Sequence, residues 1–316
     1  MVNKKIVCLG GGVGTANLIK GLKRYFEDIT VILSMADDGG SSGRLRRLYN
    51  IPPPGDLVSC MAALTDKSSY VYKLLSYRFL GDRYGSDTDL PGHKLGNLIM
   101  VALRDITGSF EKAISLFQEM FGVKGEFLPA TVQNVTIYAR TIEGKLIYGE
   151  EKIDLGKYPG KRILDKVFLK PESAKSNPLA IKSIKDADII IAGPGDLYTT
   201  ILPVLIVSGV KEALKKSKAL KIFVVNVTNK PFETKGYNST DYIVAIERHL
   251  GLFPFNQVVV NNNFSAKIPS KYKYQYVPIT NSLKSNIKII KSDMVDENFA
   301  IYHNPSKLAK TIMENI

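Results

Sequence analysis

The sequence predicts an α/β protein built on a Rossmann-like, doubly wound and mostly parallel sheet. Short segments that are almost wholly apolar recur along the chain, as strands covered by helices on both faces require. Amphipathic stretches at helical spacing separate these segments. The first apolar segment also runs directly into a glycine-rich loop that opens a helix, which is how a βαβ unit begins.

Length and composition agree with one domain spanning residues 1–316. The 316 residues are 45% hydrophobic, which is enough for a substantial core. The chain contains no apolar run of membrane-spanning length, and its start lacks the pattern of a secretory signal. We therefore expect a cytoplasmic protein without a membrane partner. Cys8 and Cys60 cannot build a disulfide framework and do not have the spacing of a zinc site.

The formal net charge of +13 comes mainly from lysines that are spread along the chain. Because no dense basic helix or basic patch with aromatic residues is present, a solvated surface explains the charge better than nucleic-acid binding. A nucleic-acid-binding module would rest on net charge alone. We expect no nucleic-acid partner, although the same field would favour a phosphate-bearing small molecule.

The expected elements follow a βα order with one interruption. The expected strands are 5–9, 29–34, 188–192, 221–226 and 257–260. A helix is expected after the glycine loop, and the others cover 57–80 with breaks, 95–105, 109–121, 205–216, 240–250 and 306–315. Between about 125 and 170 apolar and polar residues alternate around Glu143-Gly144, which predicts a small antiparallel β-hairpin insertion.

The glycine loop is the first candidate binding element, with candidate residues Gly10, Gly11, Gly12, Gly14 and Thr15. It follows a strand and opens a helix, where backbone N–H groups and the helix dipole can meet a phosphate. The full dinucleotide fingerprint is absent, because Thr15 or Asn17 stands where GxGxxG requires its last glycine. The loop predicts phosphate binding and disfavours an NAD-dependent dehydrogenase. A tight turn without a ligand is the alternative.

The second candidate element follows the second strand and consists of Asp37, Asp38, Gly39, Gly40, Ser41, Ser42 and Arg44. Rossmann proteins place here an acid that meets a ribose hydroxyl. Because adjacent carboxylates repel each other, the pair favours binding of ligand hydroxyls or of a divalent cation such as magnesium. The glycines and serines would expose backbone amides, and Arg44, Arg46 and Arg47 would contact phosphate. A flexible acidic loop is the alternative.

Three further loops combine glycine with polar residues. Their candidate residues are Gly55 and Asp56, then His93, Lys94 and Asn97, then Gly193, Pro194, Gly195, Leu197, Tyr198 and Thr199, and Asn226 at the end of a predicted strand completes the set. Asp56 is equally suited to cap a helix, and a single histidine in a loop is more often structural. The loop after 188–192 should emerge at the same sheet edge as the first glycine loop. We expect these loops to converge on one ligand.

Six segments of the chain resemble a known family: GGGVGTANLIKGLK, ADDGGSSGRLR, IPPPGD, GHKLGNL, GPGDLYTTILP and ETKGY. Their order and spacing resemble the YvcK group of the YvcK/CofD-like family, whose members are called gluconeogenesis factors. The resemblance implies a Rossmann-like fold, a cytoplasmic protein, binding of nucleotide sugars such as UDP-N-acetylglucosamine, and a role in cell shape and carbon metabolism. The enzyme branch, phospholactate transferase, shares the glycine loop and the paired aspartates but has bulkier residues after them.

The chain departs from the family pattern at three places that bear on ligand identity. Val13 replaces a threonine of the glycine loop, and Asp196 replaces the serine of a GPGS motif. Tyr302-His303-Asn304 stands where Arg-His-Asp is expected.

Two functions follow from these observations. The first is a regulatory protein that binds a nucleotide or nucleotide sugar and has no catalytic residue. The sequence does not determine its oligomeric state, and a homodimer is one possibility. The alternative is a phospholactate-transferase-like enzyme that transfers a phosphate-ester group from a nucleotide-activated donor. In that case Asp37 or Asp38 would hold a divalent metal or orient the attacking hydroxyl.

Overall fold

A seven-stranded parallel sheet forms the centre of the protein, in a computed structural model that describes residues 3–280 and 287–316. Its strands, from edge to edge, are β12 (Lys288–Ser292), β10 (Gln257–Asn261), β8 (Leu220–Val224), β7 (Ile189–Ala192), β1 (Ile6–Gly10), β2 (Ile29–Leu33) and β3 (Glu126–Pro129). Every residue of β1, β2, β7 and β10 is buried, as predicted for strands covered on both faces.

The strand order reverses between β1 and β7. From β1 the chain moves outward to β2 and β3, returns to β7 beside β1, and then continues in the other direction to β8, β10 and β12. The loops that leave the carboxyl ends of β1 and β7 therefore diverge and open a crevice, the usual ligand position in such sheets. The predicted Rossmann-like, doubly wound fold is confirmed.

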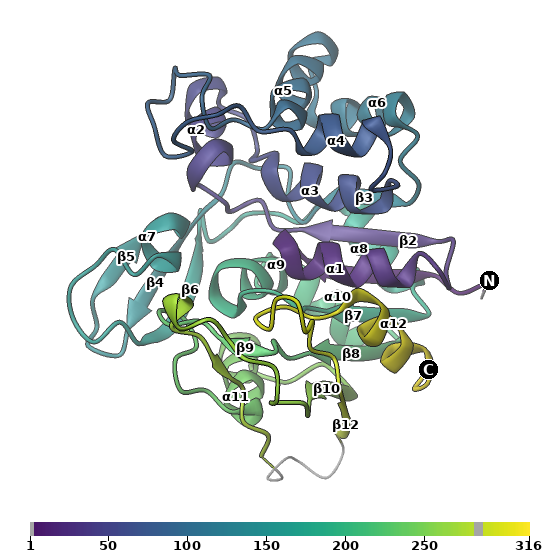
Figure 1. Cartoon of the computed structure of the whole chain (residues 1–316), viewed down its shortest axis with the longest axis vertical. Coiled ribbons are helices and arrows are strands. Elements are labelled where there is room, and N and C mark those ends of the chain that lie inside the picture. The colour runs from purple at the N-terminus through teal and green to yellow at the C-terminus, as the bar shows by residue number, and fades with distance from the viewer. Residues whose placement is uncertain (1–2, 281–286) are drawn as a thin grey trace.

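Helices cover both faces of the sheet because right-handed crossovers in opposite directions leave them on opposite sides. Helix α1 (Gly12–Leu22) packs against α12 (Pro305–Met313), and α8 (Pro178–Asp186) packs against α10 (Val210–Lys216). The helices between β2 and β3 gather at one end of the molecule (Figure 1) and comprise α2 (Gly40–Tyr49), α3 (Gly55–Leu64), α4 (Tyr70–Ser76), α5 (Leu95–Thr107) and α6 (Phe110–Phe121).

The predicted insertion is a separate antiparallel sheet beside the main one (Figure 1). It contains β4 (Thr136–Thr141), β5 (Leu146–Tyr148), α7 (Glu150–Asp154) and β6 (Leu164–Lys170), with strand order β5-β4-β6. The expected turn at Glu143-Gly144 joins β4 to β5, and Gly144 has a φ of 80°. Strand β3, which falls within the expected bounds of the insertion, instead pairs with β2 in the main sheet.

Several expected helices have different limits in the structure. The 57–80 segment forms α3 and α4, and the 205–216 segment is divided, because Gly209 with a φ of 94° separates α9 (Leu202–Leu205) from α10. The remaining elements are a π-helical turn at Leu197–Ile201, β9 (Thr228–Asn229), α11 (Ser239–Leu250), a 3-10 turn at Ser270–Tyr272 and β11 (Gln275–Tyr276). Among the described residues, every helix is too short or too polar to cross a membrane.

Candidate functional site

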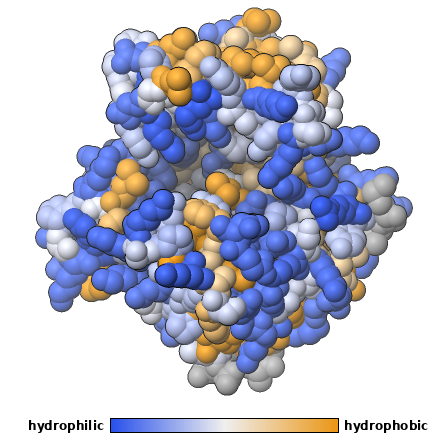
Figure 2. Space-filling model, in the orientation of Figure 1, coloured by the Kyte–Doolittle hydropathy of each residue, from blue (hydrophilic) through white to orange (hydrophobic). Residues whose placement is uncertain are grey.

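A cleft of about 360 Å³ lies at the switch point, where the sequence places its glycine loops. Residues from the loops after β1, β2, β7 and β8, from α7 and from the segment before α12 line it. Figure 2 shows a mostly hydrophilic surface on the face drawn in Figure 1, with a hollow below the helices α2 to α6. The cleft is thus built from distant parts of the chain that meet at one edge of the sheet.

Glycines allow the walls of the cleft to approach one another closely. A Cβ atom on Gly14 would lie 2.3 Å from the carbonyl oxygen of Pro194, and one on Gly11 would lie 2.5 Å from a carboxyl oxygen of Asp56. Gly12 has a φ of 62° and begins α1, whose first turn contains no acidic residue. The Thr15 hydroxyl accepts a 2.8 Å hydrogen bond from the N–H of Gly11, so it holds the loop rather than facing the cleft.

The segment after Asp38 differs from the exposed loop that the sequence predicts. Residues 40–49 form α2, in which Gly40, Ser41, Ser42 and Arg44 are buried. A Cβ atom on Gly43 would lie 1.7 Å from the carbonyl oxygen of Asp38, so the start of this helix requires glycine at position 43.

The side chains of α2 hold neighbouring segments in place. Arg44 donates to the carbonyl oxygens of Pro91, at 2.8 Å, and of Asp89. Ser41 lies 2.9 Å from Nδ1 of His93 and accepts from Asn97 at 3.2 Å. These side chains therefore fix the loop before α5 and do not line the cleft.

The two adjacent aspartates have different surroundings. Asp37 lines the cleft, and its carboxylate accepts a 3.0 Å hydrogen bond from the N–H of Gly39. The carboxylate of Asp38 lies against Gly149 and accepts a 2.8 Å hydrogen bond from the N–H of Glu151, at the start of α7. Asp38 thus anchors the insertion, and only Asp37 faces the cleft.

Three carboxyl groups of the cleft have no cation within ion-pair distance in the described part of the chain: Asp37, Asp56 and Glu150. Burial raises the pKa of Asp37 above its ordinary value. Burial and the charge of Asp37 raise the pKa of Asp56 to about 7. Burial, together with Asp37 and Asp154, raises the pKa of Glu150 as well. The charged form of these carboxyl groups is therefore disfavoured, and a bound cation would stabilise it.

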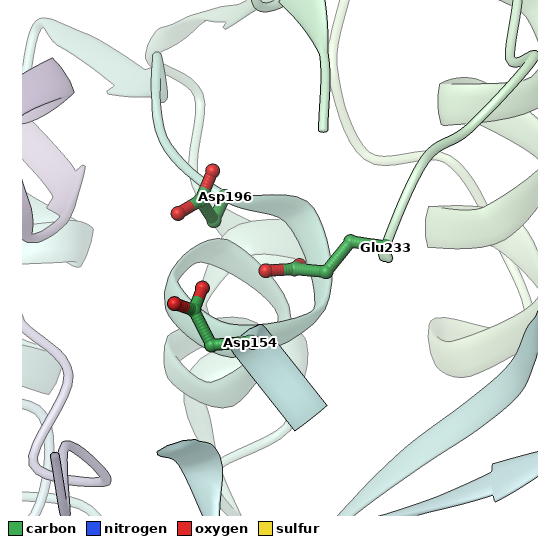
Figure 3. Close-up of side chains that lie close together, drawn as sticks. All are labelled: Asp154, Asp196 and Glu233. Atoms are coloured by element: carbon green, nitrogen blue, oxygen red, sulfur yellow. The ribbon is translucent and has the colours of Figure 1, made fainter. Parts of the chain in front are cut away.

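A second carboxylate cluster in the same region does contain a cation. Asp154, Asp196 and Glu233 point toward a common centre (Figure 3), with carboxyl oxygens within 4.8 Å of one another. The ammonium of Lys230 forms ion pairs with Asp154, with Asp196 at 2.7 Å and with Glu233 at 3.7 Å. Burial alone would lower the pKa of Lys230, but these carboxylates raise it well above its ordinary value. The ammonium occupies the position that a metal ion would need.

Glu233 has a further role beside the π-helical turn. Its fully buried carboxylate accepts hydrogen bonds from the backbone N–H of Tyr198 at 2.9 Å and from the Thr199 hydroxyl at 2.7 Å. The Tyr198 hydroxyl pairs with that of Tyr237 at 2.8 Å. Leu197 and Tyr198, both predicted to contact the ligand, are instead buried behind the cleft wall.

Two basic residues close to the cleft differ in their surroundings. Arg83 lines the cleft, and among the described residues it forms no ion pair, although its guanidinium lies near Asp37 and against Gly40. Lys94 lies outside the cleft lining and donates to the Ser59 hydroxyl at 2.8 Å. Arg46 donates to Asn134 and Arg47 pairs with Asp87, so neither lines the cleft, in contrast to Arg83.

The structure divides the predicted site residues into two groups. Those that line the cleft are Gly11, Gly12, Gly14, Asp37, Gly39, Asp56, Pro194, Gly195, Thr199 and Asn226. Those that do not are Gly10, Thr15, Asp38, Gly40, Ser41, Ser42, Arg44, Gly55, His93, Lys94, Asn97, Gly193, Leu197 and Tyr198.

Sequence reasoning did not assign several residues that the cleft contains, namely Arg83, Tyr84, Glu150, Glu151, Asp154, Thr228, Lys230 and Tyr274. Glu150 and Glu151 form an acidic pair directly after the predicted hairpin, which is a usable signal. Lys230 gives no signal, because a single lysine in a lysine-rich chain is unremarkable. Val13, Asp196 and Tyr302, which depart from the family pattern, all line the cleft.

Comparison with known proteins assigns the family. Residues 6–299 match the family described as 2-phospho-L-lactate transferase CofD. The chain belongs to this family. A gluconeogenesis factor of Bacillus subtilis is 38% identical over 98% of this chain and 97% of that protein. One from Halalkalibacterium halodurans is 34% identical over 99% of this chain and 97% of that protein. The predicted resemblance to the gluconeogenesis factors is confirmed.

Solved structures agree with this assignment. A crystal structure of a Bacillus halodurans protein of the UPF0052 family matches with a TM-score of 0.89 at 34% identity, covering 99% of each chain.

Proposed function

We propose that the cleft binds a nucleotide sugar, such as a UDP-sugar, and that the protein acts as a regulator in carbon metabolism and cell-wall synthesis. The observation that carries the proposal is the position of the cleft, where two glycine loops and the first turn of α1 meet at the switch point. Backbone N–H groups at such a position suit a diphosphate. The names of the relatives support the link to gluconeogenic growth.

A divalent cation such as magnesium forms part of this proposal. The carboxyl group of Asp56 already lies against Gly11 at the beginning of α1, where a phosphate would also bind. Two anions at one helix terminus repel each other, and a cation between them would remove this repulsion. Magnesium is commonly held by one or two carboxylates together with ligand phosphates, and Asp37 and Asp56 provide such oxygen donors. Asp38, which the sequence pairs with Asp37 as a metal ligand, is engaged with α7.

The test is a titration of purified protein with UDP-N-acetylglucosamine, GDP, NAD and inorganic phosphate, each with and without magnesium chloride. We expect the UDP-sugar to bind best and only with magnesium, and to add about 2.7 kcal/mol of stability at about 100 times its Kd. Stabilisation by NAD alone would contradict the proposal.

Arg83 gives the proposal a residue-specific test. Because its exposed guanidinium lines the cleft without an ion-pair partner among the described residues, Arg83→Gln should weaken UDP-sugar binding by about 1.5–3 kcal/mol. Arg104→Gln is the matched control, since Arg104 pairs with Asp105 on the surface. Equal affinities of the two variants would show that the phosphates bind elsewhere.

A transferase activity is the second candidate, and the pKa of Asp56 favours it. A carboxyl group with a pKa of about 7 can accept a proton at neutral pH. In that reaction an acceptor hydroxyl attacks the donor phosphorus, a nucleoside monophosphate leaves, and the hydroxyl proton passes to Asp56. Release of nucleoside monophosphate from a nucleotide-activated phosphate ester, lost in Asp56→Asn, would distinguish the enzyme from the regulator.

A further inference from the structure

A second cavity lies behind the glycine loop, between α1, α3 and α4. Its volume is about 220 Å³. Three lysines line it: Lys20 from α1, Lys67 from the loop between α3 and α4, and Lys94 from the start of α5. The other polar groups of its wall come from Asn17, Ser59, Tyr72 and Ser76, and no aspartate or glutamate belongs to the lining.

Two of the three lysines, Lys20 and Lys67, carry charge that no carboxylate among the described residues pairs with. Lys20 and Lys67 lie within hydrogen-bonding distance of each other, and in the part of the chain that the structure describes neither ammonium forms an ion pair. Burial and Lys67 lower the pKa of Lys20 to about 8. Lys23 and Arg24 also repel the charge of Lys20, although the Lys23 ammonium itself donates to carbonyl oxygens at the end of α3 and is attracted by Asp66. Asp66, the neighbour of Lys67 in sequence, is exposed and accepts a hydrogen bond from Ser68 at 2.9 Å.

This arrangement contrasts with that of Lys230, which carboxylates surround on several sides. Lys20 is half-buried and Lys67 is exposed, so the cost of bringing the two ammonium groups together comes mainly from their mutual repulsion, which an anion between them would remove. The remaining wall is apolar and consists of Val13, Ala16, Val58, Ala62, Ala63 and Leu75. A basic end with apolar walls suits a phosphate group on a short carbon skeleton.

We propose that the cavity lined by Lys20, Lys67 and Lys94 is a second anion site, which binds a small phosphorylated metabolite separately from the ligand of the cleft. The two cavities adjoin each other, because Val13 lines both.

The direct test follows the titration of Lys20 by NMR on protein labelled with carbon-13 lysine, with inorganic phosphate as the probe. The Lys20 signal is assigned with Lys20→Arg. Because a bound dianion favours the charged ammonium, we expect phosphate to raise the pKa of Lys20 from about 8 by roughly one unit. Arg83→Gln, which alters the cleft, should leave this response unchanged. An unchanged Lys20 titration at saturating phosphate would overturn the proposal.

Calorimetry with inorganic phosphate at constant ionic strength supplies a second measurement. Lys20→Gln and Lys67→Gln should each weaken binding at this site about tenfold, whereas the exposed Lys112→Gln should have no effect. Lys20→Arg should keep most of the affinity, because it keeps the charge. If Lys20→Gln and Lys67→Gln bind phosphate as Lys112→Gln does, the cavity is not an anion site. Unfolding curves of all variants confirm that each is folded.

Discussion

The cleft contains two carboxylate clusters that differ mainly in the presence of a cation. Asp154, Asp196 and Glu233 surround Lys230. Asp37, Asp56 and Glu150 face the same cleft, but in the described residues no ammonium or guanidinium lies within ion-pair distance of them. Carboxyl groups therefore serve two purposes within one region of the molecule.

Asp154, Asp196 and Glu233 with Lys230, the paired cluster, connect separate parts of the fold. Through Lys230 it joins α7 of the insertion, which carries Asp154, to the loop after β7, which carries Asp196. Asp37, Asp56 and Glu150, the unpaired cluster, have no such ammonium among the described residues, and burial together with neighbouring carboxylates raises their pKa values. A ligand can compensate charge that the fold leaves unpaired. The comparison therefore separates residues that stabilise the cleft from residues that are available to bind a ligand.

Removal of the Lys230 ammonium from the paired cluster should have the largest effect on the free energy of unfolding. Lys230→Met keeps the length of the side chain but leaves three carboxylates, with 21%, 35% and 0% of their side chains exposed, without a counter-charge. We expect a loss of about 3–5 kcal/mol in the free energy of unfolding, measured with urea at neutral pH.

Lys310→Met is the control for this change. Lys310 pairs with Glu314 at 3.7 Å on the surface, with 71% and 62% of the two side chains exposed, so its loss should cost less than about 1 kcal/mol. Equal costs in the two variants would mean that water, and not Lys230, compensates the paired cluster.

Asp56→Asn should stabilise the ligand-free protein, with an effect that depends on pH. The pKa of Asp56 is about 7 in the folded protein and about 3.9 in an unfolded chain. Between these values the folded state binds a proton that the unfolded state releases, so the free energy of unfolding falls as pH rises from about 4 to 7. Asp56→Asn removes this titration and should be more stable than the wild type by about 1–3 kcal/mol above pH 7.

Magnesium should reverse the order of stability of the wild type and Asp56→Asn. Because the cation favours the charged carboxylate, magnesium chloride should stabilise the wild type at neutral pH more than it stabilises Asp56→Asn. Asp105→Asn, on the surface beside Arg104, should follow the wild type throughout. A pH-independent difference between wild type and Asp56→Asn would show that Asp56 does not titrate in this range.

More of the fold than of the candidate site could be predicted from the sequence. The apolar strands and the glycine loop after β1 determine the sheet and its switch point, because burial on both faces leaves a local pattern. Helix α2 could not be predicted, because Gly39-Gly40-Ser41-Ser42-Gly43 has weak helix propensity and becomes helical only through tertiary contacts. Strand β12 and helix α8 were also not expected.

The sequence indicated the parts of the cleft wall that are formed by backbone. It did not indicate the parts formed by side chains that come from distant segments. Gly11, Gly12 and Gly195 line the cleft because loops at the ends of neighbouring parallel strands must meet there. Nothing local indicates that Lys230 reaches Asp154, which lies 76 positions earlier in the chain. The roles of Ser41 and Arg44 likewise depend on the packing of α2 against the loop before α5.

The smallest expected effect compares the two adjacent aspartates directly. In Asp38→Asn the side-chain oxygen can still accept the hydrogen bond from the N–H of Glu151, so we expect a loss of only about 0.5–1 kcal/mol in unfolding free energy and unchanged magnesium affinity. Asp37→Asn has the same change in size and charge, but it removes a carboxylate that lines the cleft. It should therefore weaken magnesium binding about tenfold or more, as loss of a charged ligand does, with little loss of stability. Unfolding in urea and calorimetric titration with magnesium chloride measure both quantities for each variant. If Asp38→Asn weakens magnesium binding as much as Asp37→Asn does, the two aspartates act as a pair, and the division between a residue that anchors the insertion and one that faces the ligand is wrong.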